Sequence, residues 1–168
     1  MMYIFHNLKV FFKNSFSLFL LTYSIISWAD FPQSCPRMSL ANNCSFYDKC
    51  LEARNQCGLD GYTLNYGLKF CKKFNAMDLS SEGEKWITKT MACLQANLIQ
   101  FAETKTDCNV IEQKAFETHV SCYIESGFCN LNASDLGVIA KTNFWAIISY
   151  QGAIQGLDIL KVCVLDKQ

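Results

Sequence analysis

Residues 81–101, SEGEKWITKTMACLQANLIQF, decide the fold class of this chain. Ser81 and Glu84 fit a capping box, in which the serine hydroxyl and the glutamate carboxylate satisfy backbone N–H groups at a helix start. Apolar residues then recur at steps of three and four, as on one face of a helix: Trp86, Ile87, Met91, Leu94, Leu98 and Phe101. The segment therefore predicts an amphipathic helix that begins near Ser81.

Similar patterns lie on both sides of this segment. Apolar residues at helical spacing predict a helix from Asp107 or Cys108 to about Glu125, and another from Ser134 or Asp135 toward Cys163. Two shorter helices are expected near residues 45–56 and 63–74. The only prolines are Pro32 and Pro36, so no later residue of this kind interrupts a helix. We expect an all-α, small disulfide-stapled helical domain of about five helices.

The first 29 residues predict a cleaved signal peptide. Lys9 and Lys13 form a basic start without any acid, and an apolar stretch follows from residue 16 to residue 28. Small residues at positions 27 and 29 then fit a signal peptidase site. An uncleaved anchor is the alternative, but a bilayer span needs about 20 apolar residues and Lys13 interrupts the run. We expect residues 1–29 to be removed and residues 30–168 to form one secreted, extracellular domain.

All ten cysteines follow the leader, and their even number predicts five disulfides in an oxidising compartment. Cys108 and Cys122 are fourteen residues apart on one predicted helix, so they share a face and each must bond to another segment. Cys50 and Cys57, seven residues apart, are also expected on one face of a short helix. The number and spacing of the cysteines leave their pairing open.

Neither a metal or cofactor site nor a catalytic site is expected. Structural zinc ligands are usually separated by two to four residues, whereas the closest cysteines, Cys44 and Cys50, have five residues between them. A hydrolase would need His119 as its base, because it is the only histidine after the leader. The segment FETHVSC, residues 116–122, lacks the paired cysteines and the following acid of secreted helical phospholipases. We expect His119 to be a partly buried helix residue beside a disulfide and the protein not to be an enzyme.

The charge pattern predicts no nucleic-acid partner. After the leader the chain has 13 basic and 15 acidic residues, a net charge of −2. No later apolar run reaches spanning length, so the mature chain is not expected to be embedded in a membrane. Lys69, Lys72 and Lys73 form a small basic face, which we interpret as solvated surface, with a sulfated glycan or acidic partner as the alternative. Asn43 and Asn132 are possible N-glycosylation sites, and the second is favoured because Cys44 adjoins the first.

Short motifs surround the cysteines along nearly the whole mature chain. They are CSFYDKCLE (44–52), CG (57–58), YG (66–67), FCKKF (70–74), GEKW (83–86), CLQ (93–95), Cys108, AF (115–116), His119, CY (122–123) and GFC (127–129). Together, with ten cysteines at near-family spacing, they resemble the stanniocalcins. The resemblance implies the disulfide pairing Cys35–Cys50, Cys44–Cys71, Cys57–Cys108, Cys93–Cys122 and Cys129–Cys163.

The resemblance also implies a function. Stanniocalcins are secreted helical glycoproteins that act as hormones in calcium and phosphate homeostasis, and one member inhibits a secreted metalloprotease through a covalent disulfide. The further family cysteine that joins two subunits has no counterpart after Cys163. A covalent homodimer and covalent trapping of a protease are therefore not expected.

Several functions stay open at this point. The leading hypothesis is a secreted, non-enzymatic regulatory protein of stanniocalcin type that recognises a protein partner, either a receptor or an extracellular enzyme. The alternatives are a non-covalent inhibitor of an extracellular protease and, if the producer is a microbe, a secreted mimic of a host factor. A small secreted hydrolase that uses His119 is the remaining class.

Overall fold

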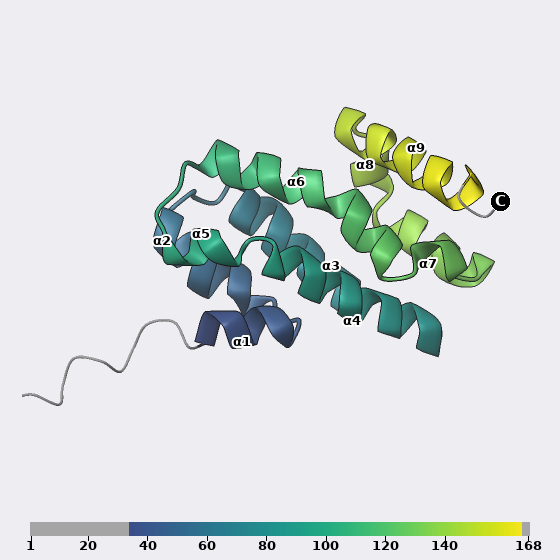
Figure 1. Cartoon of the computed structure of the whole chain (residues 1–168), viewed down its shortest axis with the longest axis horizontal. Helices are drawn as coiled ribbons and strands as arrows, with labels where there is room; N and C mark the ends of the chain where they lie inside the picture. Colours follow the sequence, from purple (N-terminus) through teal and green to yellow (C-terminus); the bar gives the residue numbers. More distant parts are fainter. Residues whose placement is uncertain (1–33, 166–168) are drawn as a thin grey trace, which may run out of the picture. The chain divides into compact units, whose positions relative to one another are not determined.

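The computed structural model describes residues 34–165 (Figure 1). Every regular element in this range is a helix, and these residues contain no strand. The predicted all-α, disulfide-stapled domain is therefore confirmed. The predicted signal peptide, residues 1–29, lies outside the described residues.

The first part of the fold consists of short helices. α1 (Ser34–Leu40) is followed by the π-helical segment η1 (Tyr47–Glu52), which continues into α2 (Ala53–Asn55). A second π-helical segment, η2 (Tyr62–Leu68), continues into α3 (Lys69–Asn75). The last four helical segments correspond to the predicted helices at 45–56 and 63–74, whereas α1 was not expected. Pro36 is compatible with α1 because the first turn of a helix does not use its backbone N–H groups.

The segment that decides the fold class forms α4 (Ser81–Ala96) and the short α5 (Ile99–Glu103), with a break at Asn97 and Leu98. The helix begins at Ser81 as predicted, but its N-cap lies one residue before the predicted cap. Ser80, not Ser81, is the N-cap, and its side chain accepts a hydrogen bond from the backbone N–H of Gly83 at 3.3 Å. The Asp135 carboxylate accepts from the backbone N–H of Ser80 at 2.8 Å and from its hydroxyl at 2.5 Å. This contact with α7 fixes Ser80 as the cap.

The predicted helix from residue 107 or 108 to 125 is confirmed as α6 (Cys108–Glu125). Asp107 caps it by accepting a hydrogen bond from the backbone N–H of Asn109 at 2.8 Å. Gly127 follows the helix with a φ of 104°, a left-handed conformation that glycine adopts without strain. The chain then forms the short 3₁₀ helix η3 (Phe128–Asn130).

The single helix predicted from residue 134 or 135 toward Cys163 is wrong. This region forms α7 (Ala133–Thr142), α8 (Phe144–Ile147) and α9 (Tyr150–Leu165). Asn143 ends α7, and its side-chain amide donates to the carbonyl of Ile139 at 2.9 Å. Ser149 precedes α9, and its hydroxyl accepts from the backbone N–H of Gly152 at 3.1 Å. These two polar side chains satisfy backbone groups at the breaks, which lets the chain change direction.

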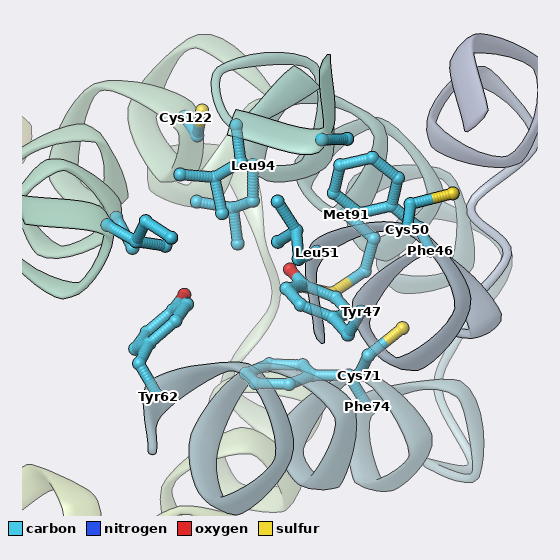
Figure 2. Close-up of a cluster of buried hydrophobic side chains, with 14 of the residues drawn as sticks. Phe46, Tyr47, Cys50, Leu51, Tyr62, Cys71, Phe74, Met91, Leu94 and Cys122 are labelled. Carbon is cyan, nitrogen blue, oxygen red and sulfur yellow. The ribbon is translucent and has the colours of Figure 1, made fainter. Parts of the chain in front are cut away.

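The core lies where η1, η2, α4 and α6 pack together, and Figure 2 shows its central side chains. Phe46, Tyr47 and Leu51 are fully or almost fully buried. A Cβ atom at Gly67 would lie only 2.4 Å from the Tyr47 ring, so η2 can approach η1 this closely only because residue 67 is glycine. On the other side of the core, the Trp86 indole N–H donates to the carbonyl of Tyr123 at 3.2 Å, which connects α4 to α6.

Candidate functional site

The ten cysteines are paired in the structure as Cys35–Cys50, Cys44–Cys71, Cys57–Cys108, Cys93–Cys122 and Cys129–Cys163. These are the pairs that the resemblance implied. Their Cα–Cα distances are 5.3 to 5.9 Å, within the range that a disulfide spans. One local expectation is wrong: α2 ends at Asn55 and Gln56 is left-handed, so Cys57 lies outside the helix and does not share its face with Cys50.

His119 lies inside the domain, only 2% exposed, on the face of α6 that points toward η2. Its ring stacks on Tyr66 and Tyr123 with centroids 6.0 and 5.6 Å away, and the Phe116 ring meets it edge-on at 5.2 Å. Burial lowers the pKa of His119 from 6.5 to about 4, and a hydrogen bond with the Gln155 side chain offsets part of that shift. The imidazole is therefore neutral near pH 7.

The outer surface of α8 and α9 carries a large set of apolar side chains. Trp145 is 79% exposed and Leu157 is 67% exposed, although both are large and apolar. We use the name apolar face for the exposed residues Phe144, Trp145, Ile148, Ile154, Leu157, Leu160, Val164 and Leu165. Exposed apolar side chains that gather on neighbouring helices mark interaction sites in soluble proteins.

The geometry of α9 explains why its apolar residues do not all reach the core. Ile159 is buried, and Gln155 and Cys163, one turn before and after it, are partly buried on the same side of the helix. Four apolar-face residues of α9, at positions 154, 157, 160 and 164, follow steps of three and four on a different side. α9 therefore has one side that packs toward α6 and a second, apolar side toward solvent. Packing against α6 needs only the first of these two sides.

The sequence analysis did not identify the apolar face. A signal was present, because the apolar residues from position 144 to position 165 are too many for one helix stripe about 100° wide. The prediction of one continuous helix gave the wrong set of side chains on each face, because the chain breaks at Asn143 and Ser149. The apolar residues in excess of one stripe were therefore not recognised as a second face.

The predicted basic face lies on α3, where Lys69, Lys72 and Lys73 are exposed. The Lys73 ammonium lies over the Phe70 ring, 4.9 Å from its centroid. This arrangement fits the interpretation as solvated surface.

Both possible glycosylation sites are exposed but differ in their hydrogen bonds. Asn132 is the N-cap of α7, and its side-chain nitrogen donates to the Ser80 hydroxyl at 3.2 Å and to the Asp135 carboxylate at 2.9 Å. A glycan on that nitrogen would replace one of its two hydrogens and remove one of these bonds. The Asn43 side-chain oxygen accepts from the backbone N–H of Ser45 at 3.0 Å, a bond that glycosylation leaves intact.

Within residues 34–165, His, Cys, Asp and Glu side chains form no group of three or more that could hold a metal ion. None of the helices in that range combines the length and the apolar character needed to cross a bilayer.

No protein-family model, no curated protein and no solved structure matches the chain. The five disulfides are consistent with an extracellular protein, because such bonds persist in oxidising compartments.

Proposed function

We propose that this protein is a secreted, non-enzymatic regulator that binds another protein through the apolar face of α8 and α9. The observation that carries the proposal is the exposure of Trp145 and Leu157 beside the other apolar residues of that face. Exposed tryptophan and large aliphatic side chains contribute a large part of the binding energy at protein interfaces when a partner buries them.

The surroundings of His119 support the non-enzymatic part of the proposal. A general base is most effective with a pKa near the working pH. The pKa of His119, about 4, lies well below the pH of extracellular fluid. Its ring neighbours Tyr66, Phe116 and Tyr123 provide no carboxylate to orient the imidazole.

The role as a stanniocalcin-type hormone of calcium and phosphate homeostasis is the more specific form of the proposal. It is supported by the cysteine motifs quoted from the sequence and by the disulfide pairs that connect them. The structure adds a possible contact surface for a receptor or an extracellular enzyme, which is what either a hormone or a non-covalent protease inhibitor requires.

The test is affinity capture from extracellular fluid of the producing organism with the disulfide-intact protein. A variant carrying Trp145→Ser and Leu157→Ser is compared with a control carrying Leu59→Ser. Leu59 is 83% exposed but lies in the loop between α2 and η2, outside the apolar face. We expect the wild type and the control to retain the same partner and the double variant to lose it.

Equal capture by all three proteins would contradict the proposal, since the apolar face would then be dispensable. Light scattering provides the second criterion: if the wild type forms a dimer that the double variant does not form, the face binds a second copy of this chain and the regulator hypothesis loses its support. The identity of the captured protein separates the specific forms, because a protease whose activity falls on binding indicates an inhibitor and a receptor indicates a hormone.

A further inference from the structure

A cavity of about 420 Å³ lies between the core and the last helices and is open on one side, where the exposed residues Ala140 and Leu160 line it. Small residues leave this space: Ala140 on α7, Ala146 on α8, and Gly152 and Gly156 on α9 all line it. A Cβ atom added at Gly156 would meet no other atom within 4 Å. Protein interiors are otherwise close-packed, so a cavity of this size is a feature to explain.

The lining of the cavity is mostly apolar, and its described residues carry no charge near pH 7. Rings form much of it: Tyr62, Tyr66, Phe70, Trp86, Tyr123 and Phe128. None of the described lining residues is a lysine, arginine, aspartate or glutamate, and the one histidine is neutral. The volume lies within the range of about 300–1,000 Å³ typical of small-molecule sites, which are also predominantly apolar. Such a lining favours an uncharged, largely apolar occupant.

His119 is one of the lining residues and carries a buried hydrogen-bond acceptor. The Gln155 amide nitrogen donates to the carbonyl of Phe116 at 3.1 Å, which leaves the Gln155 oxygen to accept from the His119 ring. Nδ1 of His119 has no hydrogen-bond partner among the described residues, so the bond to Gln155 uses the other ring nitrogen. In a neutral imidazole the nitrogen without a proton is an acceptor, and here that nitrogen is Nδ1.

Asn143 supplies a second acceptor in the same lining. Its amide nitrogen donates to the carbonyl of Ile139 at 2.9 Å, which identifies the other atom of the amide as oxygen. That oxygen has no partner among the described residues, although Asn143 is only 7% exposed. Buried acceptors are normally satisfied, so two unsatisfied ones in the lining of one cavity indicate a missing donor.

We infer that this cavity binds a small, uncharged and largely apolar molecule that carries one hydroxyl group, with the hydroxyl donating to Nδ1 of His119 or to the side-chain oxygen of Asn143. The aromatic side chains of the lining make apolar contacts with the ligand. Because of the two acceptors, a ligand with a hydroxyl group binds more tightly than a ligand of the same shape without one. Leu160 belongs both to the cavity lining and to the apolar face, but binding of the small molecule needs no protein partner.

The test uses 1-naphthol and naphthalene, which share a ring system and differ by the hydroxyl. Titration calorimetry on the full, disulfide-intact protein is expected to show saturable binding of 1-naphthol and about fivefold weaker binding of naphthalene, the difference expected for one hydrogen bond. In the variant Gly156→Leu the new side chain occupies part of the cavity, and both probes are expected to bind more weakly. Gly137→Leu is the matched control, because Gly137 is an exposed α7 residue whose added Cβ also meets nothing within 4 Å.

Equal binding by the Gly156→Leu and Gly137→Leu proteins, or no saturable binding of 1-naphthol to the wild type, would overturn the inference. A second variant keeps the test decisive if Gly156→Leu does not fold. His119→Phe retains an aromatic ring and removes the acceptor, so it should bind naphthalene as the wild type does while the preference for 1-naphthol shrinks. If His119→Phe and Asn143→Leu both keep the wild-type preference for 1-naphthol over naphthalene, neither acceptor binds the hydroxyl group. That result would refute the proposed site.

Discussion

Acidification should destabilise this domain through His119, in a pH window set by its pKa. The folded value is about 4 and the ordinary value is 6.5. Between these values the unfolded chain binds a proton that the folded chain does not, so the free energy of unfolding falls as the pH falls. The contribution is fully present above pH 6.5 and is lost progressively as the pH drops to about 4.

The size of the effect follows from the shift. A change of one pKa unit corresponds to about 1.4 kcal/mol, so a shift from 6.5 to about 4 corresponds to about 3 kcal/mol. The neighbouring rings, Tyr66, Phe116 and Tyr123, do not titrate in this window. Asp135, whose pKa is lowered by hydrogen bonds from the side chain and backbone of Ser80 and from Asn132, loses its contribution only below its ordinary value of 3.8.

Urea unfolding with the disulfides intact measures this effect. The wild type should lose about 3 kcal/mol between pH 7 and pH 4 from this group, whereas His119→Phe, which cannot titrate, should lose that much less over the same range. The comparison removes the effect of surface carboxylates, which both proteins share. If the two proteins show the same dependence on pH, His119 is not a buried neutral imidazole and the reasoning fails.

Three further predictions concern stability, each measured by urea unfolding. Gly67→Ala places a methyl group against the Tyr47 ring and should destabilise the domain by about 1–3 kcal/mol; an unchanged midpoint would mean that η2 moves freely from η1. Replacing both Cys57 and Cys108 with alanine opens a closure of 51 residues and should lower the free energy of unfolding by about 4 kcal/mol; a loss below 1 would contradict the loop-entropy argument. Ser80→Ala removes the α4 cap and should destabilise by about 1 kcal/mol, and a neutral result would show that the cap is dispensable.

The helical class could be predicted from the sequence because periodicity is a local property. The pattern from Ile111 to Cys122 places one face of α6 against the core, and the structure buries those residues. The break between α7 and α9 was missed because apolar periodicity continues across it. Asn143 and Ser149 are residues that often cap helices, and giving them more weight would have divided the predicted helix at the observed positions.

The position of the α4 cap depends on a contact between distant segments. Ser80 and Ser81 are chemically equivalent in the sequence, and only the Asp135 carboxylate, 55 residues along the chain, distinguishes them. The cavity has the same origin. Gly156 on α9, Ala140 on α7 and Gly67 on η2 line one space only because the fold brings them together. The α4 cap and the cavity depend on contacts between distant segments, so no local sequence pattern predicts them. Composition and helical spacing are local properties, and they predicted the helical class.

The disulfides are distributed unevenly along the chain, with most of them before α7. Four of the five connect segments between α1 and α6, around the core of Phe46, Tyr47 and Leu51. The elements from α7 to α9 are covered by the single bond from Cys129 to Cys163. A bond of this kind restricts the unfolded chain but does not fill the interior next to it. α9 packs against α6 on the side of Ile159 and Gln155, while small residues of α9 line the cavity and other apolar residues point toward solvent. The apolar face lies where packing, rather than cross-linking, determines the structure, and the cavity lies between that region and the cross-linked core, since Cys71 lines it. A ligand or a partner that completes this packing would accordingly add most to the stability of this part of the chain.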